Sequence, residues 1–185
     1  MKSALFTALL LAAVNATADA VVIEKLNNEG FREVLVRSGD LFISGQPSEA
    51  GLARLQREGV TTVVNLRTHA EMDDREVVDF DEAAAVEALG MTYVHIPSGG
   101  PDSPYSPEMV SRFAEAVAMS DGKVLLHCTV AWRASHLYTA YLNRYQGLNL
   151  QDAIATGQSI NLGTLPLQGF LGKSLEIVVS EPEAE

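Results

Sequence analysis

Short apolar runs alternate with amphipathic stretches along most of the chain. Runs rich in β-branched and apolar residues predict strands at residues 34–37, 41–44, 61–66, 91–96 and 124–126. Helical spacing of apolar residues, with capping residues or glycines at the ends, predicts helices at residues 49–58, 81–89, 107–118 and 134–145. Less regular patterns, interrupted by glycines, predict two more helices at residues 151–158 and 165–179. This alternation predicts one α/β domain with a mostly parallel central sheet flanked by helices.

The first 20 residues have a different pattern from the rest. Lys2 precedes an apolar stretch from Ala4 to Val14, and Ala18-Asp19-Ala20 is typical of a signal-peptide cleavage site. We therefore expect a signal peptide at residues 1–20, a domain at residues 21–179 and a disordered tail at residues 180–185. An uncleaved anchor or a buried N-terminal helix is the alternative. The prediction is a periplasmic or secreted protein with no membrane insertion after cleavage.

The charge balance restricts the partners of the domain. The chain has 24 acidic and 13 basic residues, a net charge of −11, and removal of Lys2 and Asp19 leaves that charge unchanged. Such a surface argues against binding to nucleic acid or to anionic membranes, and any anion site must be locally basic. The only cysteine, Cys128, has no partner for an internal disulfide. In an oxidising compartment it would be a free reactive thiol or form an intermolecular bond.

The segment from Lys123 to Ser135, KVLLHCTVAWRAS, carries the candidate chemistry. Cys128 lies where a buried strand is expected to lead into a helix, and backbone N–H groups at a helix N-terminus favour an anion such as a thiolate. Arg133, five positions later, has a planar fork of donors suited to an oxyanion. These features predict nucleophilic group transfer by cysteine. The alternative for Cys128 is a buried core thiol.

The residues His127, Cys128, Arg133 and Ser135 resemble the cysteine loop of the dual-specificity and tyrosine phosphatase superfamily. The segment FISGQPSEAGLARLQREGVTTVVNLR and the later HIP are more specifically similar to its bacterial branch, the phosphatase-like domain of beta-lactamase hydrolase-like proteins. The likeness covers most of residues 41–145. It implies a phosphatase-like fold and a cysteinyl-phosphate mechanism that acts on a phosphorylated substrate, without a cofactor or a metal.

The resemblance also assigns roles to individual residues. Cys128 would attack phosphorus, and Asp102, the only aspartate in the loop after HIP, would protonate the leaving group. His127 and Ser135 would support the nucleophile, although His127 fits a hydrogen-bonded core histidine equally well. The oxygens of the phosphoryl group would be held by the loop residues Thr129, Val130, Ala131, Trp132 and Arg133.

Three features depart from the phosphatase pattern. Four residues separate Cys128 from Arg133, where tyrosine phosphatases usually have five. The loop contains no glycine, and Ser135 is two positions past the arginine, where the pattern has a hydroxyl residue directly after it. A loop of this length also resembles rhodanese-type sulfurtransferases, which carry a persulfide on the cysteine. A sulfurtransferase and a non-catalytic anion-binding domain therefore stay as alternatives.

Arg67, at the end of TTVVNLR, has two interpretations. It lies where ligands bind at the carboxyl edge of an open α/β sheet, so that it would add positive charge to the site. The favoured alternative is a salt bridge with Glu71, four residues later, if that stretch is helical.

Overall fold

A six-stranded sheet forms the centre of the molecule. The computed structural model describes residues 21–163 and 166–176. The strand order is β1-β2-β3-β6-β4-β5, and β3, β6, β4 and β5 run parallel, whereas β1 and β2 are antiparallel to their neighbours. The strands are β1 (Glu24–Lys25), β2 (Leu35–Ser38), β3 (Leu41–Ser44), β4 (Val60–Asn65), β5 (Thr92–His95) and β6 (Lys123–His127). The predicted α/β domain with a mostly parallel sheet is confirmed.

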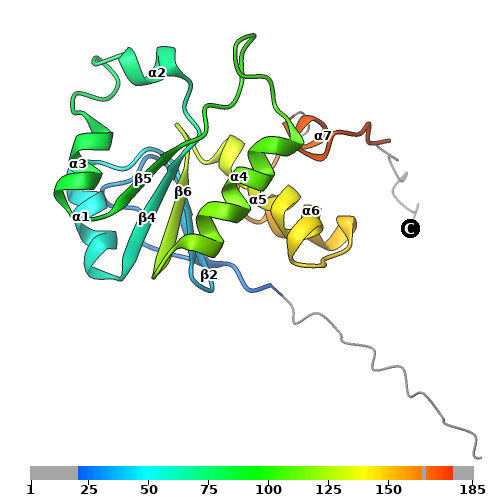
Figure 1. Ribbon diagram of the computed structural model, residues 1–185. Helices are drawn as coiled ribbons and strands as arrows, with labels where there is room; N and C mark the ends of the chain where they lie inside the picture. Colours follow the sequence, from blue (N-terminus) through cyan, green and yellow to red (C-terminus); the bar gives the residue numbers. More distant parts are fainter. Residues whose placement is uncertain (1–20, 164–165, 177–185) are drawn as a thin grey trace, which may run out of the picture.

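Helices cover both faces of this sheet (Figure 1). They are α1 (Glu49–Arg57), α2 (His69–Asp73), α3 (Glu82–Ala88), α4 (Pro107–Met119), α5 (Trp132–Tyr145), α6 (Leu150–Gln158) and α7 (Pro166–Leu171). The helices α1 and α3 pack on one face, and α4, α5, α6 and α7 lie on the other. The short α2 and the loop before α4 lie together beyond one edge of the sheet (Figure 1).

The side chains of β6 point alternately into two hydrophobic cores, one on each face of the sheet. Leu125 packs with the α1 and α3 side chains, whereas Leu126 and Cys128 belong to the cluster under α4 and α5. Successive side chains of a strand point to opposite faces, so a strand covered on both sides is apolar throughout. The continuous run of Val124, Leu125 and Leu126 shows this pattern.

The register of the central strands determines where a site can form. Ser44 of β3 and Asn65 of β4 both pair with His127, the last residue of β6. The carboxyl ends of three parallel strands therefore meet at one level, and the loop that carries Cys128 starts there. Ligands of open α/β sheets bind at this edge.

The largest helical difference from the sequence prediction is at the C-terminal end. A helix was expected over residues 165–179, but α7 ends at Leu171, and Gly172 follows with a left-handed φ of 66°. A glycine in this conformation terminates a helix, which is the physical reason for the shorter element. The expected signal peptide, the expected tail and residues 177–179 lie outside the described residues. Within the described residues, no helix is long and apolar enough to cross a membrane.

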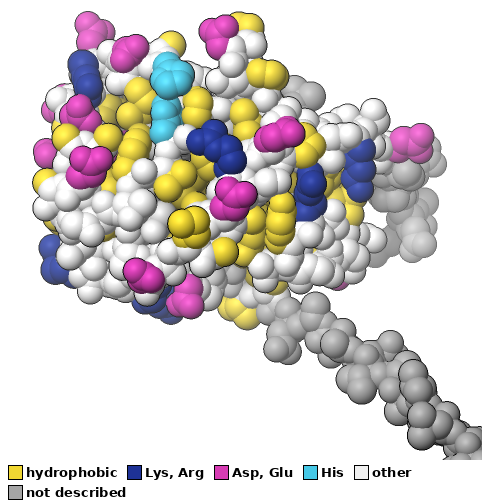
Figure 2. Space-filling model, viewed as in Figure 1, with side chains coloured by type: hydrophobic (Ala, Val, Ile, Leu, Met, Phe, Trp, Pro, Cys, Tyr) yellow, Lys and Arg dark blue, Asp and Glu magenta, His cyan; other side chains and the backbone are white. Residues whose placement is uncertain are grey.

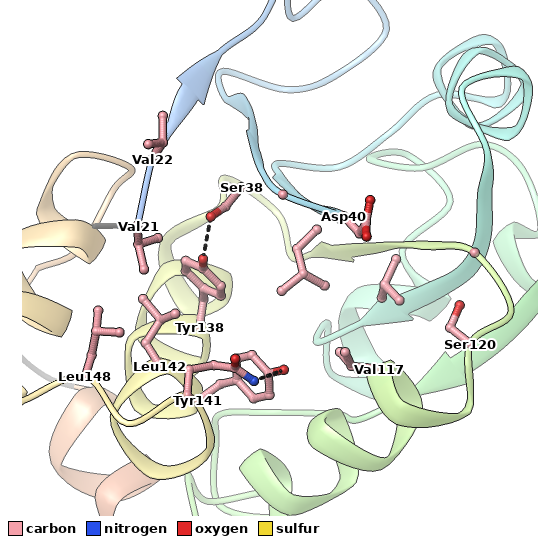
Figure 3. A pocket seen from close by; sticks show the side chains of 15 residues that line it. Val21, Val22, Ser38, Asp40, Val117, Ser120, Tyr138, Tyr141, Leu142 and Leu148 are labelled. Atoms are coloured by element: carbon pink, nitrogen blue, oxygen red, sulfur yellow. Dashed lines mark hydrogen bonds between the residues drawn. The ribbon is translucent and has the colours of Figure 1, made fainter. Parts of the chain in front are cut away.

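Another cavity lies at the edge of the sheet where β3 and β6 begin, and Figure 3 shows the side chains that line it. Its volume is about 700 Å³, and its wall includes the β2–β3 turn, Val124 at the start of β6, and the C-terminal part of α5. Tyr138 donates a hydrogen bond of 2.7 Å to Ser38 across one side of it. No candidate catalytic residue lines this cavity.

Candidate active site

Cys128 lies at the bottom of a smaller cavity at the carboxyl edge of the sheet. Its thiol is free, and only 1% of the residue is exposed. The loop after β6 leads into α5, whose first residue is Trp132, so Cys128 lies between a strand and a helix, as expected. The cavity has a volume of about 390 Å³ and is lined by Thr68, Glu71, Gly99, Gly100, Tyr105, Cys128, Thr129, Val130, Trp132 and Arg133.

Ala131 adopts the left-handed backbone conformation that a glycine would normally provide in such a loop. It precedes α5 with a left-handed φ of 64° and is completely buried. This conformation costs a residue with a Cβ roughly 1–2 kcal/mol, and alanine carries the smallest such side chain. The glycine-free loop therefore still makes a left-handed turn directly before α5.

Three contacts from distant elements hold the backbone of the cysteine loop. The Cys128 amide donates to the Ser44 carbonyl at 3.4 Å, and the Gln46 amide donates to the Thr129 carbonyl at 3.0 Å. The side-chain amide of Asn161 donates to the Val130 carbonyl at 2.7 Å. Sequence reasoning did not identify Gln46 or Asn161, because neither has a local motif that marks it as a partner of the loop.

Arg133 is fixed by a carboxylate on the opposite wall of the cavity. Its Nη1 and Nη2 donate to the two oxygens of Glu71 at 2.7 and 2.6 Å, and Nη1 also donates to the Ser98 carbonyl at 2.9 Å. Thr129 donates to the same carboxylate at 2.8 Å. The bidentate geometry orients the guanidinium and places a negative charge next to the expected anion cradle.

The charges of this pair are stable near neutral pH. Burial alone would raise the pKa of Glu71, but hydrogen bonds from Arg133, Thr68 and Thr129 lower it to about 2. Burial opposes the charge of Arg133, but the hydrogen bond and charge of Glu71, together with the charges of Cys128 and Tyr105, outweigh it, so that the pKa of Arg133 is raised. Both groups are therefore ionised near neutral pH.

Glu71 was not predicted as a site residue, although the sequence contains a signal for it. Thr68 and Glu71 form a capping box at the start of α2, and the T-x-x-E pattern is typical of such a helix start. The predicted salt bridge between Arg67 and Glu71 is wrong. Arg67 donates instead to the Glu71 backbone carbonyl and to Gln46, because the Glu71 carboxylate turns toward Arg133.

The other predicted site residues lie at different distances from the cavity. Asp102 is exposed in the turn of the loop before α4 and does not line the cavity, whereas Tyr105 from the same loop does. The Ser135 hydroxyl donates to the Trp132 carbonyl at 2.8 Å inside α5. The His127 ring lies on the α3 side of the sheet, 2.7 Å from Glu82, while Cys128 belongs to the other face. The acid role of Asp102 stays a prediction.

No group of three or more His, Cys, Asp or Glu side chains that would hold a metal ion occurs in residues 21–163 and 166–176.

Comparisons with known proteins identify the family and support the fold. The family model of the beta-lactamase hydrolase-like protein, phosphatase-like domain, matches residues 31–142. The beta-lactamase hydrolase-like protein of Xylella fastidiosa strain Temecula1 is 34% identical over 98 residues, which is 53% of this chain and 22% of the relative. The chain thus matches less than a quarter of the length of this relative.

Solved structures show the same fold. A DUF442 phosphatase candidate from Shewanella putrefaciens CN-32 is 31% identical, with a TM-score of 0.58, over 78% of this chain and 91% of that protein. TpbA from P. aeruginosa is 22% identical, with a TM-score of 0.56, over 76% of this chain and 80% of TpbA. TpbA has also been solved in complex with phosphotyrosine. The family match includes β3, β4, β6, the cysteine loop and most of α5, so the chain belongs to the phosphatase-like domain family of beta-lactamase hydrolase-like proteins.

Proposed function

We propose that the protein is a cysteine-dependent phosphatase of the dual-specificity type. The observation that carries the proposal is the position of Cys128, which lines one cavity with Arg133 at the N-terminus of α5. An anion in this cavity would meet the helix amides and a guanidinium, and both favour a phosphoryl group. Membership of a phosphatase-like family supports the same chemistry.

In the proposed reaction the Cys128 thiolate attacks phosphorus. The S–P bond forms while the ester P–O bond breaks, and the leaving oxygen takes a proton. Water then attacks the cysteinyl phosphate, the S–P bond breaks, and inorganic phosphate leaves. The loop amides and Arg133 hold the phosphoryl oxygens as charge shifts during both steps.

Arg133 would share its donors between the substrate and Glu71. Its hydrogen bonds within the described residues come from Nη1 and Nη2, and Nε has no partner among them. Nε is therefore available to a phosphoryl oxygen without breaking the contact to Glu71. In this arrangement Glu71 orients the guanidinium, at the expense of some of the positive potential of the cradle.

We further propose that Asp102 protonates the leaving group. The support is its position in the loop that contributes Gly99, Gly100 and Tyr105 to the cavity wall. We also propose that the protein is periplasmic or secreted, on the basis of the signal-peptide pattern in residues 1–20. N-terminal sequencing of exported protein would then begin at Val21.

Sulfur transfer is the second candidate function. One observation favours it: the loop has one residue fewer than usual between cysteine and arginine. In that reaction the Cys128 thiolate would take the outer sulfur of thiosulfate and release sulfite. Cyanide would then remove the sulfur as thiocyanate and regenerate the thiolate.

Parallel assays distinguish these functions. Wild type and Asp102→Asn are each assayed with an aryl phosphate, with an alkyl phosphate, and with thiosulfate plus cyanide. Phosphoryl transfer to a poor leaving group needs an acid, so Asp102→Asn should slow hydrolysis of the alkyl phosphate by about 10²–10⁴-fold. The aryl phosphate should be affected less. Equal rates on the alkyl phosphate would remove Asp102 from the mechanism, and turnover of thiosulfate alone would favour the sulfurtransferase.

A further inference from the structure

Three side-chain hydroxyl groups of the described residues line the active-site cavity, and they differ in whether they are already bound. They belong to Thr68, Tyr105 and Thr129. The hydroxyls of Thr68 and Thr129 both donate to the Glu71 carboxylate, at 3.0 and 2.8 Å. The Tyr105 hydroxyl has no hydrogen-bond partner among the described residues. It is therefore the one hydroxyl of these three that can donate to a ligand.

The nitrogen donors of the cavity side chains add one further group. Nη1 and Nη2 of Arg133 are bound to Glu71, whereas Nε has no partner among the described residues. The indole nitrogen of Trp132 lies against Gly163, since a Cβ added to that glycine would be 2.7 Å from it, and Gly163 does not line the cavity. The side-chain donors left for an anion are therefore Nε of Arg133 and the hydroxyl of Tyr105.

Tyr105 is held in place by contacts on two sides. Its ring packs on Phe170 of α7, with the ring centroids 5.1 Å apart and an angle of 58° between the planes. Gly169 permits this contact, because a Cβ there would lie 2.5 Å from the Cβ of Tyr105. Gly99 lines the cavity, and a Cβ there would lie 3.0 Å from the Tyr105 hydroxyl oxygen. A side chain that is already ordered loses little entropy when it binds a ligand.

The Tyr105 hydroxyl keeps its proton at neutral pH. Burial is the main reason that the pKa of Tyr105 is raised; the charge of Arg133 acts against this, and the charges of Cys128 and Glu71 add to it. A protonated phenol donates a hydrogen bond, whereas a phenolate would repel an anion. The group on the cavity wall is thus a neutral donor.

We propose that the Tyr105 hydroxyl donates a hydrogen bond to an outer oxygen of the tetrahedral oxyanion that binds beside Cys128. It supplies a donor in a cavity whose cysteine loop is one residue, and hence one amide, shorter than usual. The inference rests on the anion site of the proposed function and deepens it. It applies to a phosphoryl group and to thiosulfate, and it differs from the role of Asp102, which would protonate the leaving oxygen.

Anion binding tests this proposal without any turnover. Trp132 is the only tryptophan of the chain and lines the cavity, so its fluorescence reports on binding there. All proteins in this test carry Cys128→Ser, so that no group is transferred, and each is titrated separately with inorganic phosphate and with thiosulfate. Tyr105→Phe keeps the ring that packs on Phe170 and removes only the hydroxyl.

Tyr105→Phe should raise the Kd for the anion by about tenfold or more, which is the usual effect of losing a hydrogen bond to a charged group. Tyr145→Phe is the matched control and should leave Kd unchanged, because the Tyr145 hydroxyl donates to Ser111 at 2.9 Å and does not line the cavity. A loss confined to phosphate or to thiosulfate would support the role and identify the ligand. Unchanged Kd values for both anions in folded Tyr105→Phe would overturn it.

Nuclear magnetic resonance of protein with carbon-13 in its tyrosine rings gives a second measurement, with Tyr105 intact. The Tyr105 resonance should shift as phosphate saturates the site, and that of Tyr145 should not; no shift of Tyr105 would overturn the proposal. Anion binding that depends on Tyr105, in a protein that turns over no substrate, would contradict the proposed function and leave this role intact. Hydrolysis of an aryl phosphate by Tyr105→Phe, with wild-type kcat and KM, would do the reverse.

Discussion

The contact between Arg133 and Glu71 fixes one side chain of the cavity wall to another. Glu71 is negatively charged and therefore adds no attraction for an anionic ligand. Its two short hydrogen bonds nevertheless determine the direction of the Arg133 guanidinium. The pair of Arg54 and Glu58 at the end of α1 is held by one hydrogen bond of 3.1 Å, and Arg54 otherwise donates to backbone carbonyls. The difference between the two pairs lies in burial and in the additional donors from Thr68 and Thr129.

This difference predicts how stability depends on pH. The pKa of Glu71 is lowered from 4.5 to about 2 in the fold, so its contribution is complete above about pH 4.5 and is lost as the pH falls toward 2. Urea unfolding of Glu71→Gln should therefore show a weaker loss of stability between pH 4.5 and 3 than the wild type. Glu58→Gln is the matched control and should follow the wild type, because exposed pairs contribute little. Parallel curves for Glu71→Gln and wild type would contradict the pairing.

At the scale of elements, the turn from β6 into α5 is the critical feature. Ala131 adopts a φ of 64° without exposure to solvent, and this turn connects the cysteine loop to the first residue of α5. A β-branched residue strongly disfavours this region of the backbone map. The identity of residue 131 therefore affects both folding and the shape of the cradle.

Ala131→Val should destabilise the protein by about 2–3 kcal/mol, from backbone strain together with overpacking of a filled site. Ala131→Gly should stay within about 1 kcal/mol of the wild type, because relief of strain offsets the greater entropy of the unfolded chain. Urea unfolding measures both values. Equal stability of the valine and glycine variants would show that the left-handed turn does not form at Ala131.

The elements differ in how far the sequence could predict them. The apolar run around Leu125 identifies β6, because a strand buried on both faces is apolar throughout. The helical spacing after Arg133 identifies α5, because a helix buried along one face repeats its apolar residues at helical intervals. The pairing of Glu71 with Arg133 and of Gln46 with Thr129 has no local pattern, since it arises from the order of the strands. Asp102 was chosen from its loop alone, and the structure brings Tyr105 rather than Asp102 to the cavity wall.

At the scale of the whole molecule, the net charge of −11 opposes the approach of an anionic substrate. Acidic side chains are spread over the visible face rather than collected in one patch (Figure 2). Their summed field acts over roughly 10 Å at 0.1 M salt and is weakened as the salt concentration rises. The positive charge of Arg133 is paired with the negative charge of Glu71 and therefore cannot reverse this negative field at a distance.

For a dianionic aryl phosphate, kcat/KM should therefore rise when NaCl increases from about 0.01 to 0.15 M, by roughly two- to fivefold. Alkylation of Cys128 by neutral iodoacetamide is the control and should change little over the same range. A value of kcat/KM that falls with salt would indicate a locally positive approach to the cavity and contradict this account of the surface.

The most direct test of the central claim is hydrolysis of an aryl phosphate by wild type and by Cys128→Ser, with circular dichroism as the check on folding. We expect turnover by the wild type, with a cysteinyl phosphate on Cys128 that mass spectrometry detects after rapid quenching. In the serine variant the rate should fall by at least about 10³-fold, because a hydroxyl is a far poorer nucleophile at neutral pH. Hydrolysis at the wild-type rate by a correctly folded Cys128→Ser would contradict the cysteine mechanism.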